Sequence, residues 1–291
     1  MVKKYSQLYL DARRSFMEVE DQETASLLAR NLLCFVSGKT REEIVVDREK
    51  YACEAVCEAM DAAVGRILGG EPLAYVLGEW EFYGMNLYVD KNVLIPRDDT
   101  VAVTALAIKK GLFLDQEPRI LDLCTGSGCI GLAIAHRVKD AKVTLADISK
   151  DALSVARKNV ARQKLAGRVT CVQADALTAP SAFLGKFDMI VSNPPYITTK
   201  EMEELDDSVR NYEPHLALHG GTDGLDFYRS IVINYSKILK PGGCICFEYD
   251  PAQADDVCLL LEENGFSILE RAKDYNDRER AVLAQYGKKE D

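Results

Sequence analysis

Five short apolar runs, separated by segments of helical length, constrain the fold of this chain more than any other feature. Each run is five or six residues long, which suits a strand and is too short for a helix. Strands that alternate with helices pair in parallel, so the pattern predicts a doubly wound α/β sheet. The runs are residues 119–123, 142–146, 169–173, 187–192 and 244–249.

The last part of the chain departs from this alternation. Residues 267–273 and 280–286 have strand character, and the polar residues 274–277 between them can turn the chain. Two consecutive strands joined by so short a turn pair antiparallel. We therefore expect an antiparallel C-terminal hairpin at one edge of the sheet.

The first part of the chain has helical spacing instead. Apolar residues recur at Leu8, Ala12 and Phe16 and in two later sets, which predicts a small helical bundle over residues 1–75. Thr40 and Glu43 fit a capping box, and Gly38 and Gly69-Gly70 are typical helix ends. We expect this bundle to carry part of a surface that recognises the substrate.

The period changes to two between the bundle and the sheet. Met85, Leu87 and Val89 alternate, residues 90–92 can turn, and residues 93–95 return. This pattern predicts a β-hairpin linker over residues 76–96, followed by a catalytic domain over 97–291. Thr100 is a candidate cap for a helix over residues 101–110.

Composition excludes several classes of protein. The formal net charge is −10 and no Lys/Arg cluster is present, so we expect no direct binding of nucleic acid, which usually requires a basic stripe. No apolar run approaches the ~18 residues of a membrane span, and the N-terminal residues do not resemble a signal peptide. The nine cysteines and three histidines lack metal-binding spacing. We expect a cytoplasmic protein with reduced thiols and no metal or membrane partner.

The run 187–192 ends in Asn193-Pro194-Pro195-Tyr196. Proline cannot donate to a sheet ladder, so the chain leaves the sheet there, at the edge where open α/β sheets bind ligands. The side-chain oxygen of Asn193 and the main-chain oxygen of Pro194 can accept both hydrogens of one NH2 group, and Tyr196 adds a flat face. The motif therefore suits a planar amide or amino group, although an ordinary Pro-Pro turn is the alternative.

Residues 120–131 have the order strand, glycine turn and helix, which favours an anionic ligand at the helix N-terminus. Asp147 ends the next strand, where its carboxylate can accept from both ribose hydroxyls, and Asp175 follows the third strand, where it can meet an adenine amino group.

The turn also satisfies the G-x-G-x-x-G pattern, so these residues alone fit NAD and S-adenosylmethionine equally well. A dehydrogenase needs a hydride-handling site, whereas an amide-binding motif needs only an electrophile. S-adenosylmethionine supplies one.

The chain resembles the HemK/PrmC family of protein-(glutamine-N5) methyltransferases nearly end to end, and its second domain is similar to the class I, Rossmann-like methyltransferase fold. It departs from the family pattern at residues 98–101, at Cys124, where the family usually has glycine, and at Tyr249-Asp250. The matching residues are Glu71-Pro72, Tyr75, Gly78, Phe82, 94–97, Thr100, 122–128, 193–196, Glu213-Pro214, Ala217-Leu218, Gly220-Gly221, 223–225, Tyr228, 239–243, Glu248, Gln253, Lys273-Asp274 and Arg278.

The resemblance implies methyl transfer from S-adenosylmethionine, with S-adenosylhomocysteine as product, to the glutamine of the Gly-Gly-Gln motif in bacterial class I peptide chain release factors. It implies that the catalytic residues are Asn193, Pro194, Pro195 and Tyr196. The cofactor-binding residues that it implies are Asp122, Cys124, Thr125, Gly126, Ser127, Gly128, Asp147, Asp175 and Ala176, together with Asn193.

Two alternatives stay open. Asn-Pro-Pro-Tyr is shared with adenine-N6 methyltransferases of nucleic acids, because an aromatic amine presents the same NH2 group; such an enzyme would have to bind a flipped base and a phosphate backbone. A module that binds S-adenosylmethionine or a protein tail without turnover is the alternative outside enzymology.

Overall fold

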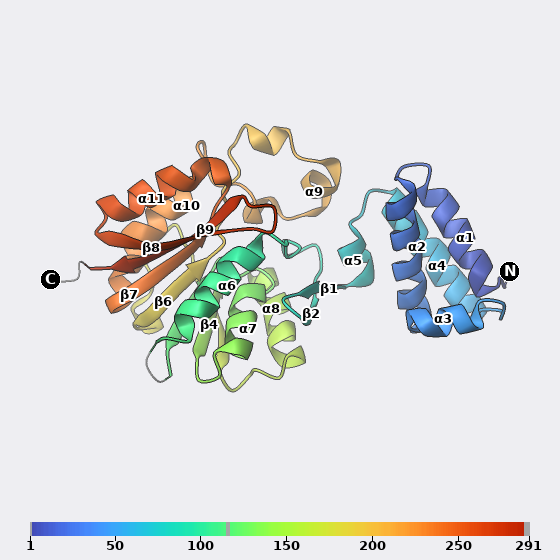
Figure 1. Ribbon diagram of the computed structural model, residues 1–291, viewed down its shortest axis with the longest axis horizontal. Helices are drawn as coiled ribbons and strands as arrows, with labels where there is room; N and C mark the ends of the chain where they lie inside the picture. Colours follow the sequence, from blue (N-terminus) through green and yellow to red (C-terminus); the bar gives the residue numbers. More distant parts are fainter. Residues whose placement is uncertain (1, 115–116, 288–291) are drawn as a thin grey trace. The chain divides into compact units, whose positions relative to one another are not determined.

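The computed structural model describes residues 2–114 and 117–287 of the chain (Figure 1). These residues divide into two compact units, Met1–Gly78 and Glu79–Asp291. Each unit has its own hydrophobic core. None of the described helices is long and apolar enough to cross a membrane.

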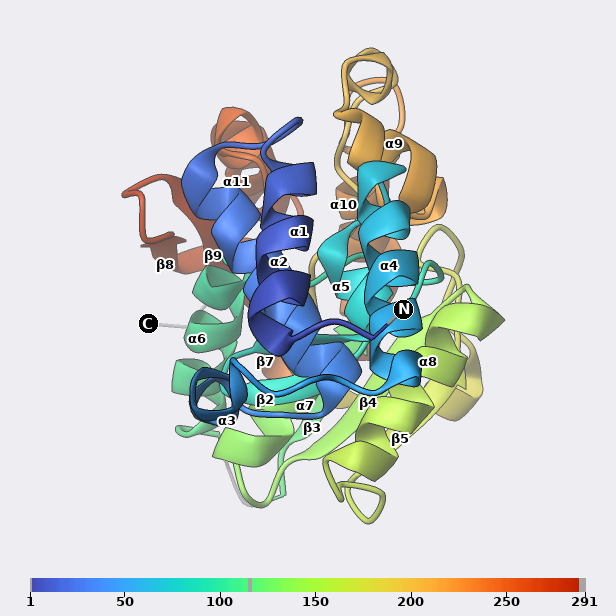
Figure 2. The same cartoon turned by 90° about the vertical axis from the view of Figure 1, so that its right-hand side faces the viewer.

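The first unit is a bundle of helices, as the helical spacing predicts. Helices α1, α2 and α4 pack side by side (Figure 2), and their buried faces include Leu8, Phe16, Leu32 and Met60. The capping box is present, because Thr40 and Glu43 exchange side-chain hydrogen bonds with each other's backbone N–H. The helices are α1 Tyr5–Phe16, α2 Gln22–Ser37, α3 Arg41–Asp47, α4 Glu54–Leu68 and α5 Leu73–Leu77.

The second unit is built on a seven-stranded sheet with the order β5-β4-β3-β6-β7-β9-β8. The first five strands in this order, β5, β4, β3, β6 and β7, pair in parallel. Strand β9 pairs antiparallel with both β7 and β8. The predicted parallel sheet and antiparallel edge hairpin are confirmed. The strands are β3 Arg119–Leu123, β4 Lys142–Asp147, β5 Val169–Gln173, β6 Phe187–Ser192, β7 Leu239–Glu248, β8 Phe266–Lys273 and β9 Glu279–Tyr286.

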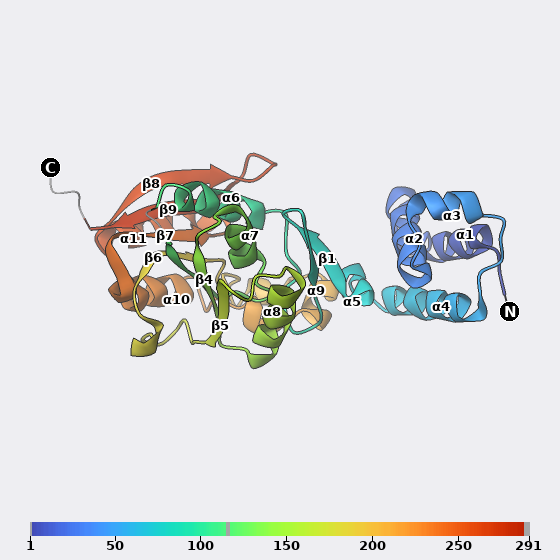
Figure 3. The same ribbon diagram turned by 90° about the horizontal axis from the view of Figure 1, so that it is seen from below.

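Helices cover both faces of this sheet. Helices α6 and α7 lie on one side and α10 on the other (Figure 3). The two faces of β6 take part in different cores, since Met189 and Val191 pack with α6 and α7 whereas Ile190 packs with α10 and α11. The longer helices are α6 Thr100–Gly111, α7 Cys129–Arg137, α8 Lys150–Arg162 and α11 Ala254–Glu263. Shorter turns are η1 Ala182–Leu184, η2 Glu201–Glu203, α9 Asp207–Tyr212, η3 His215–Ala217, α10 Asp226–Ser230, η4 Ile231–Tyr235, η5 Ser236–Ile238 and η6 Pro251–Gln253.

The linker hairpin differs from the prediction. Its strands are β1 Glu79–Phe82 and β2 Met85–Tyr88, joined by Tyr83-Gly84. Both turn residues have positive φ, 52° and 77°, which matches the tight turn that the twist of a hairpin favours. The expected turn at residues 90–92 is present, since Val93 donates its N–H to the Asp90 oxygen at 3.1 Å, but the expected return strand at 93–95 was wrong. Val89, Val93 and Ile95 are buried, but none of them lies in a strand. Their apolar side chains pack into the core, and this burial explains the alternation of apolar residues that suggested a strand.

Two smaller expectations also need correction. Thr100 is the first residue of α6 rather than its cap, which is Asp99. Strand β7 begins at Leu239, five residues before the predicted start at 244, since Leu239 pairs with Phe187 ahead of an irregularity in the ladder. Leu239 is followed by Lys-Pro-Gly-Gly, which reads as a turn rather than as part of a strand, so the sequence did not indicate this pairing.

Candidate active site

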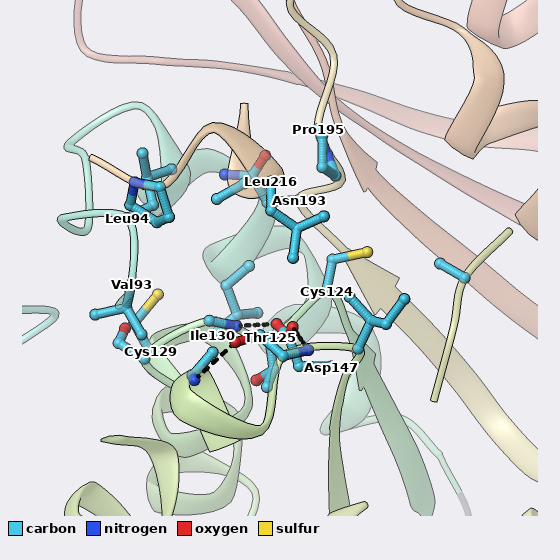
Figure 4. A pocket seen from close by; sticks show the side chains of 18 of the residues that line it. Val93, Leu94, Cys124, Thr125, Cys129, Ile130, Asp147, Asn193, Pro195 and Leu216 are labelled. Carbon is cyan, nitrogen blue, oxygen red and sulfur yellow. Dashed lines mark hydrogen bonds between the residues drawn. The ribbon is translucent and has the colours of Figure 1, made fainter. Parts of the chain in front are cut away.

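A pocket opens at the carboxyl ends of β3, β4, β5 and β6 within the second unit (Figure 4). Its floor is the turn between β3 and α7, and one wall is made by the residues that follow β4 and β5. Asn193 and Pro195, which follow β6, form a second wall. The remaining wall combines residues 92–97 with Pro214, Leu216 and Ala217. The pocket therefore lies where parallel α/β sheets bind their ligands.

The turn after β3 gives the pocket floor its shape. Cys124, Thr125, Gly126 and Ser127 line the pocket, as the sequence predicts, whereas Gly128 lies behind them as the N-cap of α7. Cys124 has φ +60°, a conformation that favours glycine. Glycine is also the usual residue at this position in the family that the sequence resembles. Burial raises the pKa of the Cys124 thiol well above its usual range, so it stays neutral.

Asp122 supports this turn from beneath and is not among the residues that line the pocket. Its Oδ2 accepts hydrogen bonds from the Thr125 hydroxyl at 2.6 Å and from the Gly131 N–H at 2.8 Å. Its Oδ1 is buried without a hydrogen-bond partner among the residues that the structure describes. Burial raises the pKa of Asp122 to about 7, and the two hydrogen bonds oppose that shift. Asp122 therefore shapes the turn after β3 rather than facing the pocket.

Asp147 and Asp175 reach the pocket from the ends of β4 and β5. Asp147 accepts from the Gly126 N–H and the Ser149 N–H, both at 2.9 Å, which ties the ends of β3 and β4 together. Burial raises the pKa of Asp147, and these backbone hydrogen bonds oppose the shift. Asp175 accepts from the Leu177 N–H at 2.8 Å, and its neighbour Ala176 is buried beside it. Each carboxylate keeps acceptor capacity toward the pocket.

The Asn-Pro-Pro-Tyr motif begins where β6 ends. Asn193 lines the pocket, and its Nδ2 donates to the Thr100 Oγ1 at 3.3 Å. Pro195 also lines the pocket, whereas Pro194 and Tyr196 do not. Tyr196 packs against the core beneath α10 and α11, and burial raises its pKa, so its phenol stays neutral. The structure thus brings Asn193 and Pro195 into the same pocket as the turn after β3.

The backbone after this motif is fixed by residues that had no assigned role in the sequence. Ile197 donates its N–H to the Leu218 oxygen and accepts from the Gly220 N–H, at 2.9 and 2.8 Å. Gln253 donates from Nε2 to the Tyr196 carbonyl oxygen at 3.0 Å. A Cβ at Gly220 would lie 2.7 Å from the Pro195 oxygen, so this close approach requires glycine. In the sequence, only the match of Gly220 and Gln253 to the family pattern indicated that these two residues matter at the site.

Glu248 is a further residue that sequence reasoning did not assign. It ends β7, is only 1% exposed, and lies next to Asn193, because the parallel register pairs Ser192 with Phe247. Burial raises the pKa of Glu248 to about 8, and the nearby side chains of Thr100, Arg280 and Asn193 oppose that shift. A carboxyl residue at the end of an apolar central strand was the signal that could have revealed it.

Glu213 joins the two segments that complete the pocket. It is 4% exposed, accepts from the Ile95 N–H at 3.2 Å and forms an ion pair with Arg97. Burial raises the pKa of Glu213, and the positive charge of Arg97 opposes the shift. Glu213 thereby fixes residues 92–97 against Pro214.

The remaining cysteines and histidines have structural surroundings. All nine cysteines are free thiols, and His136, His215 and His219 bond to Gln163, the Arg210 oxygen and Thr199. Within residues 2–114 and 117–287, no group of three or more His, Cys, Asp or Glu side chains could hold a metal ion.

Comparison with known proteins agrees with this architecture. Residues 7–78 match the PrmC N-terminal domain, and residues 103–212 match the methyltransferase small domain. A solved methyltransferase from Pyrococcus furiosus aligns with a TM-score of 0.51 and 18% identity, over 77% of this chain and 98% of that one. That similarity supports the methyltransferase fold.

Curated relatives align over almost the whole chain. The release factor glutamine methyltransferase of Clostridium acetobutylicum is 40% identical over 88% of this chain and 90% of its own length. That of Chlorobaculum tepidum is 41% identical over 89% of this chain and 90% of its own length. That of Geobacter sulfurreducens is 37% identical over 96% and 95%. The resemblance drawn from the motifs is confirmed, and the chain belongs to the family of release factor glutamine methyltransferases.

Proposed function

We propose that this protein transfers a methyl group from S-adenosylmethionine to the side-chain amide nitrogen of the glutamine in the Gly-Gly-Gln motif of class I peptide chain release factors. One observation carries the proposal: Asn193 and the cofactor turn, with Asp147, line the same pocket in a chain of this family. The reaction belongs in the cytoplasm, where release factors act on ribosomes.

The pocket residues fit S-adenosylmethionine. The turn formed by Cys124 to Ser127 would hold the methionine end, Asp147 would accept from the ribose hydroxyls, and Asp175 with Ala176 would receive the adenine. Asp122 contributes by fixing the turn through Thr125. When bound, S-adenosylmethionine supplies an electrophilic methyl carbon on its sulfonium.

Asn193 and Pro194 would hold the substrate amide. Because the Asn193 NH2 group bonds to Thr100, its Oδ1 is the atom left to accept one substrate hydrogen, and the Pro194 carbonyl oxygen accepts the other. An amide nitrogen is a poor nucleophile, since its lone pair takes part in the resonance behind the ~18–20 kcal/mol barrier to amide rotation. Holding both hydrogens can turn that lone pair toward the methyl carbon. Pro195 restricts the turn. Tyr196 packs against the core and does not line the pocket, so the lining does not support its predicted place on the amide plane.

This arrangement works without a dedicated general base. Holding two reactants in attack geometry can lower a barrier by ~7–11 kcal/mol. Once the nitrogen carries the methyl group it is strongly acidic, and its proton stays on the nitrogen, hydrogen-bonded to Asn193 Oδ1 or the Pro194 oxygen, until water removes it. The neutral phenol of Tyr196 is not required as an acceptor.

The family and the charge both disfavour the nucleic-acid alternative. An adenine-N6 methyltransferase must bind a flipped base and a phosphate backbone, whereas this chain carries a net charge of −10. The intact Asn193 to Tyr196 motif disfavours a binding module without turnover.

The direct test is incubation with methyl-labelled S-adenosylmethionine and, in parallel, a bacterial class I release factor, its Gln→Ala variant at Gly-Gly-Gln, and duplex DNA. We expect label only in the intact release factor. Label in DNA would overturn the proposal in favour of the adenine enzyme, and label in none of the three would favour a binding role.

The matched variant for the substrate site is Asn193→Ala. We expect about 100-fold slower methyl transfer, since one donor–acceptor contact to the reacting group is lost, with unchanged cofactor affinity in calorimetry. A large loss of cofactor binding with normal turnover would refute the assignment of Asn193 to the substrate amide.

A further inference from the structure

The linker hairpin is supported by one face of helix α8, which lies beside β2 (Figure 1). Strands β1 and β2 form a two-stranded sheet of their own, and such an isolated hairpin is marginally stable at best in water. Its residues Phe82, Met85 and Leu87 pack into the core that also contains Ala156 and Val160 of α8. The order of the hairpin therefore depends on this helix.

Polar side chains near the C-terminal end of α8 add to this support. Arg162 forms an ion pair with Glu79 at 2.6 Å, and Gln163 Nε2 donates to the Asn86 oxygen at 2.9 Å. Both contacts lie near the surface, where an ion pair contributes little to stability. Asn159, one helical turn before Gln163, is instead 0% exposed. Its hydrogen bonds to the hairpin are therefore shielded from water.

The side-chain amide of Asn159 joins two backbone segments that are distant in the sequence. Its Oδ1 accepts from the Tyr88 N–H at 2.7 Å, and its Nδ2 donates to the Tyr88 oxygen and to the Ser127 oxygen, both at 2.9 Å. These partners fix the orientation of the amide, because a backbone N–H only donates and a carbonyl oxygen only accepts. Asn159 thus connects the end of β2 with the turn after β3.

The carbonyl group of Ser127 needs this donor. In a regular helix the Gly131 N–H would bond to the oxygen of Ser127, four residues earlier, but here it donates to Asp122 Oδ2 at 2.8 Å. Asn159 Nδ2 supplies a donor in its place, and so avoids the cost of burying an unpaired carbonyl. Ser127 lines the pocket and is 2% exposed. Asn159 therefore fixes a part of the turn that faces the pocket.

We propose that Asn159 is a positioning residue for cofactor binding, which holds Ser127 in place and links the turn of residues 124–127 to the hairpin. The inference rests on the proposed assignment of this turn to S-adenosylmethionine. The effect is reciprocal: the factor by which the link raises cofactor affinity is also the factor by which bound cofactor stabilises the link. Residues 79–88 do not line the pocket, so the cofactor acts on the hairpin through Asn159.

The first test measures binding of S-adenosylhomocysteine, which involves no turnover. Asn159→Ala removes the bond to Ser127, and we expect the dissociation constant in calorimetry to rise about tenfold. With saturating S-adenosylmethionine, kcat should fall by less than about twofold, because the residue acts on cofactor binding and not on methyl transfer. Asn159→Asp keeps the acceptor for Tyr88 but turns an oxygen toward two carbonyl groups, and should weaken binding at least as much. Unchanged affinity in folded Asn159→Ala would overturn the proposal.

The matched control is Gln163→Ala. It removes the bond from α8 to the Asn86 oxygen and leaves Ser127 bonded to Asn159, so its dissociation constant should equal that of the wild type. An equal loss of affinity in Gln163→Ala and Asn159→Ala would overturn the proposal, since support of the hairpin and not the bond to Ser127 would then determine affinity. Thermal melting separates the two roles, because a merely structural residue would lower stability without changing affinity.

A second measurement needs no variant. In the wild-type protein, hydrogen exchange of the Tyr88 N–H, which donates to Asn159 Oδ1, should slow about tenfold when S-adenosylhomocysteine saturates the pocket. Equal exchange rates with and without the ligand would overturn the proposal. Slower exchange in a protein that does not methylate the release factor would refute the proposed function and leave this inference standing. Methylation with unchanged exchange and unchanged affinity of Asn159→Ala would refute this inference alone.

Discussion

Gly224 occupies a position where a single methyl group should disturb the site from behind. Its φ is +75°, and a Cβ there would lie closer than 3.0 Å to both Gln253 Nε2 and the Tyr196 carbonyl oxygen. These two atoms form the 3.0 Å hydrogen bond that fixes the end of the motif from Asn193 to Tyr196. Gly224→Ala therefore strains its own backbone, crowds two buried groups and breaks their bond.

The expected loss of stability follows from these three effects. A left-handed backbone costs an alanine about 1–2 kcal/mol. Overpacking typically costs about 1–3 kcal/mol and the lost hydrogen bond about 1 kcal/mol, so Gly224→Ala should lower the free energy of unfolding by about 3–6 kcal/mol. Displacement of the Tyr196 backbone should in addition reduce kcat by about 100-fold.

Gly84→Ala is the matched control. Gly84 has φ +77° in the turn between β1 and β2, and no described atom lies within 4 Å of the Cβ position. Only the backbone strain of about 1–2 kcal/mol applies there, and methyl transfer should be normal. Urea denaturation and initial rates measure both variants. Equal losses of stability would refute the crowding argument, and a destabilised Gly224→Ala with full kcat would refute the link between Gln253 and the catalytic turn.

Three further predictions concern the cofactor, a helix cap and pH. Asp147→Ala should weaken cofactor binding at least about tenfold in calorimetry, since hydrogen bonds to a charged group contribute about 1.5–3 kcal/mol; unchanged affinity, or an equal effect of Asp151→Ala on α8, would count against the ribose assignment. Thr40→Ala should destabilise the unit Met1–Gly78 by about 1 kcal/mol in urea denaturation, and no change would mean that its capping box is not formed in solution. The pKa of Glu248 is raised to about 8 in the folded protein against about 4.3 in an unfolded chain, so the folded state binds the extra proton between these values. Its stabilising effect is complete below pH ~4 and is lost as the pH rises to ~8, by up to about 5 kcal/mol. Glu248→Gln should therefore reduce the fall in unfolding free energy between pH 5 and 8, and an unchanged slope would contradict the raised pKa.

The sheet could be predicted because its strands carry their own signal. Strands β3, β5 and β6 have the bounds expected from the sequence. For β3 and β6 the reason is that a parallel strand buried on both faces reads as a nearly continuous apolar run, whereas β5 is a half-exposed strand at the edge of the sheet. The linker hairpin could not be placed in the same way. Its turn depends on the left-handed conformation of Tyr83, which no residue type announces, while the burial of Val89 and Val93 imitated a strand.

The site divides along the same line. The turn of residues 124–127 and the motif from Asn193 to Tyr196 are each continuous in sequence, so the residue types of each could suggest a chemistry. Thr100, Glu248 and Gln253 lie far from Asn193 along the chain and meet its motif only through strand order and register. Spacing in one sequence does not encode that order, which explains why these residues had no role before the structure.

The position of Asn193 and Glu248 at the ends of β6 and β7 also bears on how the site is lost. Both strands lie inside the sheet, with neighbours on either side, and such strands open only when the whole domain unfolds. Local fraying therefore cannot separate the two residues. The backbone amide protons of β6 and β7 should be among the slowest in the domain to exchange with solvent. The pocket wall that Asn193 forms and the fold of the domain should disappear together, in one cooperative transition, rather than as an early loss of activity in a protein that is still folded.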